Sequence, residues 1–183
     1  MNLIPAWNGV FFMIIVNTGN GKGKTTAAIG QIIRALGRGW KVCLIQLFKG
    51  EEFYGEQKVL CHLKNLDFYS FAPKHPKCFS EISTDSVKEE CRVATAAANA
   101  LLKGRKKYDL FVLEEFNIAV RDGYINVKEL LELVKNINQK SDVIVTGRGA
   151  PEELLEQADL VTEMKEIKHP YAKGIPARKG IEY

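Results

Sequence analysis

The chain has 183 residues and a mass of 20.5 kDa, with 46% hydrophobic and 26% charged residues, a composition that excludes extensive disorder. Its 26 Lys and Arg residues exceed its 22 Asp and Glu residues by 26 − 22 = 4, too small an excess to indicate a nucleic-acid-binding protein. No apolar run reaches the ~18 residues of a membrane span, and the four widely spaced cysteines form no Cys-x-x-Cys metal pair. We therefore expect a cytoplasmic protein with reduced thiols, no membrane segment and an anionic small-molecule ligand.

Short apolar runs alternate with longer amphipathic stretches along the chain. We expect strands at residues 13–16, 41–48, 66–71, 109–113, 142–146 and 160–164. We expect helices at residues 25–36, 86–103 and 126–137, and a short one that begins at Pro151. Because the strands are almost continuously apolar, the pattern predicts an α/β fold with a mostly parallel central sheet and helices on both faces.

Capping signals and composition give the expected boundaries. Ser86 and Glu89 have the spacing of a capping box, and Asn126 with Glu129 begins the third long helix. Residues 1–12 precede the first regular strand and are interpreted as an N-terminal extension, so a single domain is expected at residues 13–183. Residues 168–183 are polar and contain several Gly and Pro residues, and we expect them to form a loop.

The strongest motif is Thr18-Gly-Asn-Gly-Lys-Gly-Lys-Thr-Thr26, between an expected strand and an expected helix. Alternating glycines allow positive φ and a close backbone approach, so that successive N–H groups can point at phosphate oxygens near a helix N-terminus. Lys24 is expected to reach the phosphates, and the Thr25 hydroxyl to ligate Mg²⁺. Thr18 stands where the common P-loop pattern has glycine, so the loop is a variant; a turn that merely caps the helix is the alternative.

Two further elements follow expected strands. The run 108–115 is an apolar strand that ends in Glu114 and Glu115, and one of these carboxylates is expected to approach the metal. Adjacent strand residues point to opposite faces, so only one of the two should do so. Arg148 follows the strand at 142–146 and is a candidate anion clamp, because ligands of such sheets bind outside the carboxyl ends of the strands. The alternatives are a solvated pair of acids and a surface arginine.

Together these motifs resemble the ATP:corrinoid adenosyltransferases of the cobalamin-synthesis type. The resemblance extends over about residues 13–183. The segments that carry it are residues 18–26, Ile45-Gln-Leu-Phe-Lys-Gly50, Gly55-Glu56, Val112-Leu-Glu-Glu115, Val145-Thr-Gly-Arg-Gly149, Glu166-Ile-Lys-His169, Gly174 and Gly180-Ile-Glu-Tyr183.

The resemblance implies a P-loop NTPase-like (RecA-like) fold and transfer of the 5′-deoxyadenosyl group of ATP to the cobalt of a reduced corrinoid, with release of triphosphate. It implies Mg²⁺ held by Thr25 and Glu115, and catalytic roles for Lys24, Thr25 and Glu115. The implied contacts to nucleotide or corrinoid are Gly19, Asn20, Gly21, Lys22, Gly23, Lys24, Thr25, Thr26, Phe79, Arg148, Lys168 and His169. An electron-donating reductase, such as a flavoprotein, and a homodimer are implied as partners.

One stretch departs from the family pattern. Well-studied members carry a Phe-x-Trp element that displaces the lower axial ligand of the corrinoid, whereas residues 77–83 contain Phe79 and no tryptophan. Phe79 either lines the corrinoid or is an ordinary core or loop residue. Two other functions remain open: a non-catalytic regulator that binds ATP or a corrinoid, and a P-loop phosphotransferase for a small metabolite. A phosphotransferase would normally have an arginine-rich lid and a base beside the acceptor hydroxyl, and the sequence shows neither.

Overall fold

A six-stranded, all-parallel sheet forms the centre of the molecule. The computed structural model describes residues 11–50, 54–76 and 81–183. Its strands lie in the order β3-β2-β4-β5-β1-β6, with helices around them, and this confirms the predicted α/β fold. The strands are β1 (Ile14–Thr18), β2 (Val42–Leu47), β3 (Leu66–Phe71), β4 (Leu110–Glu114), β5 (Asp142–Thr146) and β6 (Leu160–Glu163).

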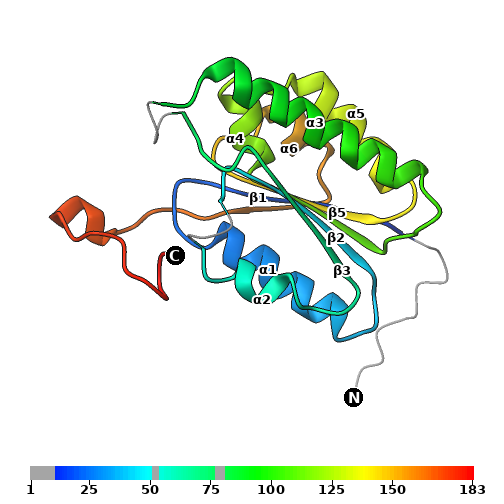
Figure 1. Cartoon of the computed structure of the whole chain (residues 1–183), viewed down its shortest axis with the longest axis horizontal. Coiled ribbons are helices and arrows are strands. Elements are labelled where there is room, and N and C mark those ends of the chain that lie inside the picture. The colour runs from blue at the N-terminus through cyan, green and yellow to red at the C-terminus, as the bar shows by residue number, and fades with distance from the viewer. Residues whose placement is uncertain (1–10, 51–53, 77–80) are drawn as a thin grey trace.

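Helices cover both faces of this sheet. Figure 1 shows α1 and α2 on one side and α3, α4, α5 and α6 on the other. The helices are α1 (Lys24–Leu36), α2 (Gln57–Leu60), α3 (Thr84–Lys103), α4 (Phe116–Arg121), α5 (Val127–Asn138) and α6 (Glu152–Gln157), followed by the 3₁₀ helix η1 (Pro170–Lys173).

Two apolar cores follow from this arrangement. All six residues of β2 are buried, and successive side chains of a strand point to opposite faces. Accordingly, Cys43 and Ile45 belong to the core under α3, α4 and α5, while Val42 and Leu44 belong to the core under α1. Burial on both faces explains why the strands are almost continuously apolar in the sequence.

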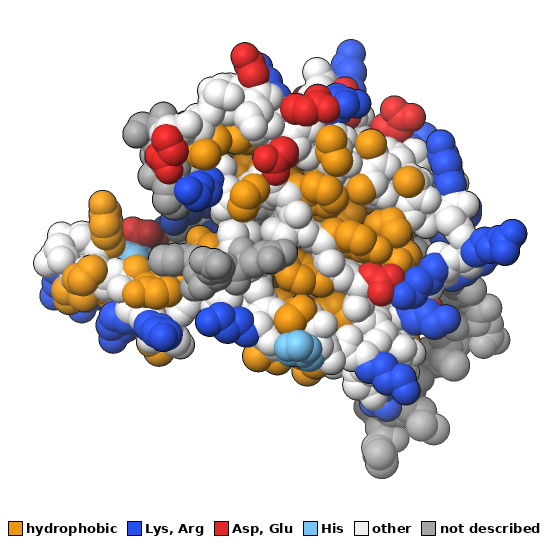
Figure 2. Space-filling view, viewed as in Figure 1, with side chains coloured by type: hydrophobic (Ala, Val, Ile, Leu, Met, Phe, Trp, Pro, Cys, Tyr) orange, Lys and Arg blue, Asp and Glu red, His pale blue; other side chains and the backbone are white. Residues whose placement is uncertain are grey.

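The edge strand β3 is less enclosed than the central strands. Each of its six residues is half-buried. Figure 2 shows hydrophobic side chains gathered in the middle of the viewed face, over the region where β3 and α3 lie in Figure 1. Among the described strands β3 pairs with β2 alone, so its other side is an edge of the sheet.

The start of α3 differs from the sequence-based expectation. The helix begins at Thr84 because Ser83, which has an extended backbone, caps it by accepting a hydrogen bond from the N–H of Ser86 at 3.1 Å. The Ser86–Glu89 spacing thus lies inside the first turns and is not the cap. By contrast, Asn126 and Glu129 form the capping box of α5.

Three elements were not expected from the sequence: α2, α4 and η1. They contain four, six and four residues, too few to show a helical hydrophobic period. The tail that was expected to be loop therefore contains one short 3₁₀ helix.

The connections place many loops at one edge of the sheet. The chain leaves β1, crosses over β5 and β4 through α1 and enters β2, so the carboxyl ends of β1, β2, β4 and β5 meet. In such sheets ligands bind in the crevice outside these ends. Figure 1 shows the tail projecting beyond β6, with the C-terminus returning toward the start of α1.

The helices, the cysteines and the N-terminal residues can each be compared with the sequence-based expectation. None of the helices in the described ranges is long and apolar enough to cross a membrane. Cys43, Cys61 and Cys91 are free thiols, and Cys78 lies outside the described residues. Residues 1–10 of the predicted extension also lie outside them, and the single domain at 13–183 stays a prediction.

Candidate functional site

The glycine loop, residues 18–24, connects β1 to α1 at the carboxyl edge of the sheet. Gly19 and Gly23 have φ values of 92° and 119°, which side chains larger than hydrogen rarely adopt. Gly23 is the N-cap of the 13-residue helix α1, whose first backbone N–H groups therefore open toward the loop. The arrangement suits an anionic group at this helix end.

The segment that follows β6 closes the back of the glycine loop. The N–H of Gly21 donates to the carbonyl of Met164 at 2.6 Å. A Cβ at Gly21 would lie 2.7 Å from that carbonyl oxygen, and one at Gly19 would lie 2.5 Å from it. Glycine is therefore required at both positions by close backbone approach. Met164 and Lys165 were missed in the sequence, because nothing local signals this contact.

Lys24 folds back over the glycine loop. Its ammonium donates to the carbonyls of Gly19 and Gly21, each at 2.7 Å, and the residue is buried. Burial lowers the pKa of Lys24; the carboxylates of Glu115 and Glu114 oppose this shift only in part. The ammonium thus lies within the predicted phosphate cradle, where two backbone carbonyls hold it.

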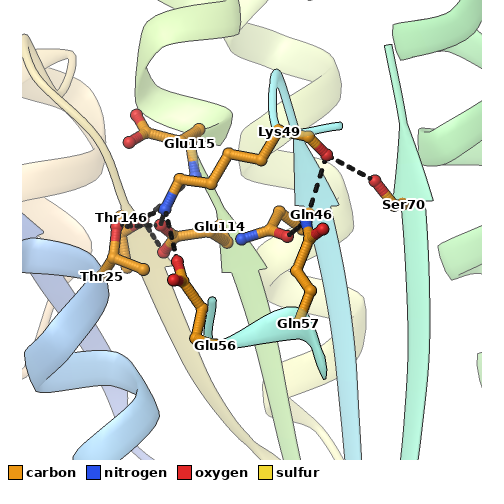
Figure 3. Close-up of polar contacts among 9 residues, drawn as sticks. All are labelled: Thr25, Gln46, Lys49, Glu56, Gln57, Ser70, Glu114, Glu115 and Thr146. Carbon is orange, nitrogen blue, oxygen red and sulfur yellow. Dashed lines mark hydrogen bonds and ion pairs between the residues drawn. The ribbon is translucent and has the colours of Figure 1, made fainter. Parts of the chain in front are cut away.

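Thr25 is joined to Glu114, the last residue of β4. The Thr25 hydroxyl donates to Glu114 Oε1 at 2.5 Å, and the Thr146 hydroxyl donates to Glu114 Oε2. Figure 3 shows these side chains gathered around one carboxylate, of which only 2% is exposed. Of the two adjacent acids, Glu114 is the one that contacts Thr25.

Lys49, which follows β2, contributes a cation that the sequence-based site did not include. Its ammonium donates to Thr25 Oγ1 at 2.7 Å and to Glu114 Oε1 at 3.1 Å, and lies 3.7 Å from Glu56 Oε1 (Figure 3). Burial alone would lower the pKa of Lys49, but the charges of Glu114, Glu115 and Glu56 raise it above its ordinary value. Lys49 could have been suspected from its place after a neighbouring strand.

Two side chains, those of Gln57 and Ser70, hold the backbone carbonyl of Lys49. Its carbonyl accepts from Gln57 Nε2 at 3.1 Å and from Ser70 Oγ at 3.0 Å, and Gln57 Nε2 also donates to Gln46 Oε1 at 2.6 Å (Figure 3). The preceding Phe48 has a φ of 62°, in the left-handed region. Non-glycine residues in this region concentrate at functional sites.

Glu115 turns away from the Glu114 carboxylate, as Figure 3 shows. It is the N-cap of α4 with a φ of 66°, and its N–H donates to Thr146 Oγ1 at 3.0 Å. Its buried Oε2 has no hydrogen-bond partner among the described residues. Burial and the charge of Glu114 raise the pKa of Glu115, while Lys49, Lys24 and Arg148 oppose the shift.

Two cavities share a wall at this edge of the sheet. The loop cavity, about 240 Å³, is lined by residues 21–25 and His169, and the aromatic cavity, about 430 Å³, by Phe48 and His75. Both are lined by Lys49, Tyr54, Glu115 and Arg148. The predicted residues Glu115 and Arg148 therefore lie between a phosphate-sized recess and a second, larger space.

The rings of Phe48, Tyr54 and His75 line the aromatic cavity. The ring of His75 lies edge-on to Phe48 and Tyr124, with centroid distances of 4.8 and 5.6 Å. His75 Nε2 lies 3.0 Å from Asp122 Oδ2, which fixes the orientation of the imidazole. Phe79, expected to contact the corrinoid, lies outside the described residues.

The C-terminal tail returns to the glycine loop. Lys22 Nζ donates to the carbonyl of Ile181 at 2.5 Å and to Glu182 Oε1 at 3.1 Å. Residues 180–183, together with Thr26, line a third cavity of about 430 Å³, the tail cavity, beside α1. His169 caps η1 by accepting from the N–H of Tyr171 at 3.2 Å and lines the loop cavity.

The remaining predicted contacts are at the surface. Asn20 and Lys168 are both exposed, and neither is among the residues that line the three cavities. The structure therefore brings together the glycine loop, Arg148 and His169, but leaves these two side chains in solvent.

The oxygen atoms beside Thr25 are suited to Mg²⁺. This ion binds through one or two carboxylates or hydroxyls and completes its shell with phosphates and water. The Thr25 hydroxyl and the Glu114 carboxylate provide such oxygens next to the glycine loop, and Glu115 lines the same cavity. No group of three or more His, Cys, Asp and Glu that could hold a metal by itself occurs in the described ranges.

An all-parallel α/β sheet with a glycine-rich loop between β1 and α1 places the chain in the P-loop NTPase-like class of folds. Within that class, a family model described as "ATP:corrinoid adenosyltransferase BtuR/CobO/CobP" matches residues 12–183. The chain belongs to this family of enzymes.

Named relatives agree with the family match. The chain is 36% identical over 179 residues to a corrinoid adenosyltransferase of Sinorhizobium sp., with 93% of this chain and 80% of the relative covered. It is 34% identical over 172 residues to a corrinoid adenosyltransferase of Pseudomonas aeruginosa, with 93% and 83% covered. It is 35% identical over 179 residues to the corrinoid adenosyltransferase CobA of Salmonella typhimurium, with 93% and 85% covered.

Proposed function

We propose that the protein transfers the 5′-deoxyadenosyl group of Mg-ATP to the Co(I) centre of a reduced corrinoid and releases triphosphate. The family match and the names of the relatives support adenosylation of a corrinoid. The finer assignment of donor, oxidation state and leaving group is what the resemblance implies, and the chemistry of the described site is compatible with it.

The observation that carries the proposal is the shared wall of the two cavities. Polyphosphate on the glycine loop would place the rest of the nucleotide near Lys49, Glu115 and Arg148, and the aromatic cavity opens on the other side of these residues. A second substrate in that space could approach the ribose without displacing the phosphates. Such alignment of two reactants is a large part of the catalytic task.

The reaction needs positioning and charge stabilisation more than acid–base chemistry. Co(I) supplies the electron pair for the new Co–C5′ bond, and the pair of the breaking C5′–O bond leaves with triphosphate. No side-chain nucleophile or general base is required. Lys24 and the backbone N–H groups of the loop and of α1 are placed to stabilise the negative charge of the leaving group.

The metal would be held by Thr25 and by a carboxylate at the end of β4. The sequence-based expectation was Glu115, whereas the contact with Thr25 favours Glu114 as the direct ligand, with Glu115 facing the same cavity. When bound, Mg²⁺ would neutralise charge on the triphosphate. Arg148 and His169 line the loop cavity and are proposed as further contacts to the nucleotide.

A single assay separates this function from its alternatives. The protein is incubated with Mg-ATP and a chemically reduced corrinoid, and the Co–C bond is followed by its visible spectrum together with the release of inorganic triphosphate. Formation of both products supports the proposal. Release of ADP or inorganic phosphate would instead indicate a phosphotransferase or an ATPase, and tight binding of either substrate without turnover would indicate a regulator.

Phe79, the reductase and the dimer stay predictions. Phe79→Ala is expected to slow reactions that start from Co(II) more than reactions that start from Co(I). Equal loss with both would contradict a role in handling Co(II). An electron-donating reductase, a homodimer and a cytoplasmic location follow from the resemblance and from composition, and we carry them forward on those grounds.

A further inference from the structure

The Lys49 ammonium lies where a divalent cation would need to bind. It contacts Thr25 Oγ1 at 2.7 Å and Glu114 Oε1 at 3.1 Å, and these are the two oxygens best placed to ligate a metal beside the glycine loop. We propose that Lys49 and the divalent cation are alternative occupants of this position, so that the metal binds only when the lysine moves away. This inference rests on the proposed Mg-nucleotide site.

Electrostatics explains why a resident cation is needed. Only 2% of the Glu114 side chain is exposed, and a buried carboxylate without a compensating cation is strongly destabilising. The hydroxyls of Thr25 and Thr146 satisfy its oxygens as hydrogen-bond donors but bring no positive charge. Lys49 supplies that charge, and a divalent ion would supply it equally well.

The geometry of Lys49 allows the ammonium to move while its backbone stays in place. Gln57 and Ser70 hold its carbonyl, whereas its four-carbon side chain, although buried, has several rotatable bonds beyond this fixed backbone. The side chain borders both the loop cavity and the aromatic cavity, and its ammonium lies 5.2 Å from the centre of the Tyr54 ring. A displaced ammonium therefore has an adjacent space that would contain the triphosphate, whose negative charge would accept it.

This arrangement couples metal binding to nucleotide binding. Without nucleotide, the metal must displace a paired ammonium, and the anions beside it are the single carboxylates of Glu56 and Glu115, so the metal should bind weakly. With nucleotide present, the triphosphate adds several negative charges next to the displaced ammonium, and both ligands should bind more tightly. Lys49 thereby opposes occupation of the site by metal alone.

The test measures metal binding in the absence of nucleotide and corrinoid. Binding of Mn²⁺, used as a paramagnetic probe for the site, is titrated through the free-ion EPR signal for wild type, Lys49→Met, Lys49→Arg and Lys58→Met. Lys58 is exposed on α2 and lines none of the three cavities, so its loss of charge is the matched control. We expect Lys49→Met to bind Mn²⁺ about tenfold more tightly or better, the size of an ordinary coupling between ligands.

The other variants test whether the gain in Mn²⁺ affinity comes from the lost charge and depends on Glu114. Lys49→Arg keeps the cation and should bind Mn²⁺ as weakly as wild type and Lys58→Met do, and Lys49→Met/Glu114→Gln should lose the gain. Equal Mn²⁺ affinity in wild type and Lys49→Met would overturn the proposal. If Lys49→Met is unstable without metal, its melting temperature should rise with Mn²⁺ while that of wild type does not; no such rise would also overturn it.

These outcomes are independent of the proposed reaction. If the variants bind Mn²⁺ as expected but the protein forms no Co–C bond, the competition between Lys49 and the metal is supported and the adenosyltransferase function is contradicted. If the protein forms the Co–C bond but Lys49→Met gains no affinity for Mn²⁺, the function is supported and the competition is contradicted.

Discussion

Individual side chains at the carboxyl edge of the sheet are held by charge and hydrogen bonds rather than by apolar contact. Glu114 receives hydrogen bonds from two hydroxyls and one ammonium, and Lys24 donates to two backbone carbonyls. Glu114, Lys24, Lys49 and Thr146 are buried, and Thr25 is half-buried. The oxygens of Thr25 and Glu114 are consequently positioned before any ligand arrives, and in the proposed competition only the Lys49 ammonium has to move for a metal to bind.

At the residue scale, Lys24→Ala is expected to abolish transfer without disturbing the fold. The substitution removes the only side-chain cation whose ammonium is seen donating to glycine-loop carbonyls in the described residues. Removal of one such charge-stabilising group costs about 10²–10³-fold in rate or more. Product formation and the far-UV circular dichroism spectrum are compared with wild type. A wild-type rate in a folded variant would show that the loop does not hold the leaving group.

The two adjacent acids can be separated by isosteric substitutions. Glu114→Gln should weaken Mg²⁺-dependent nucleotide binding by about 10–100-fold or more, the range typical for groups beside a metal. Glu115→Gln should weaken it less, because Glu115 does not contact Thr25. Titration calorimetry with a non-hydrolysable nucleotide, with and without Mg²⁺, measures both. A larger loss of nucleotide affinity in Glu115→Gln than in Glu114→Gln would indicate that Glu115, as expected from the sequence, is the metal ligand.

At the scale of elements, the glycine loop depends on the segment that follows β6. The N–H of Gly21 bonds to Met164, and the loop lies against the backbone of residues 164–165. The tail then returns through Glu182 to Lys22. The loop is thus held between α1 and the end of the chain, two elements far apart in sequence.

Gly21→Ala tests this contact between elements. The added methyl would lie 2.7 Å from Met164 O and 2.8 Å from Lys165 C, so backbone must shift at a cost of about 1–3 kcal/mol. Gly30→Ala, at an open and exposed position of α1, should instead stabilise the protein by roughly 0.5–1 kcal/mol. Urea unfolding measures both. Equal effects of the two substitutions would mean that the loop and the segment after β6 separate readily.

At the scale of the whole molecule, the two ends of the sheet serve different purposes. The carboxyl end carries the site, whereas the opposite end carries a polar cluster that joins β3 to the segment before β4. There Asp67 accepts from Lys106 Nζ at 2.5 and 2.7 Å and from the Tyr108 hydroxyl at 2.5 Å. None of these three residues lines the loop cavity or the aromatic cavity.

The cluster predicts how stability depends on pH. Burial alone would raise the pKa of Asp67, but hydrogen bonds from Lys106 and Tyr108 lower it below 3.8. A folded-state pKa below the unfolded value stabilises the protein above about pH 4, and this contribution is lost as pH falls through the folded pKa. Asp67→Asn should therefore cost about 1 kcal/mol at pH 7 and progressively less in acid.

Urea unfolding between pH 7 and pH 3 measures this dependence. Glu132→Gln, an exposed substitution on α5, serves as the control and should leave the curve unchanged. A constant difference between Asp67→Asn and wild type across this range would mean that the hydrogen bonds do not lower the pKa of Asp67.

Local signals explain which parts of the site were predictable. The glycine loop is contiguous, so its glycines, Lys24 and Thr25 were evident from spacing alone, and the strands were evident as apolar runs. The short α2 and α4 carry too few residues to show a period, and a capping-box spacing inside α3 imitated the start of a helix. Local sequence patterns therefore predict long helices and apolar strands, but not helices of one or two turns or exact helix starts.

The order of the amino acids by itself determined the α/β alternation, the phosphate-binding type of loop and the family, because each depends on residues that are close in the chain or on a shared set of motifs. The tertiary structure alone decided that Thr25, Lys49 and Thr146 meet at Glu114. Parallel strands bring their carboxyl ends to one edge. Which side chains then touch depends on strand order and register. These join residues that are 32 to 89 positions apart in the sequence, so they leave no local trace.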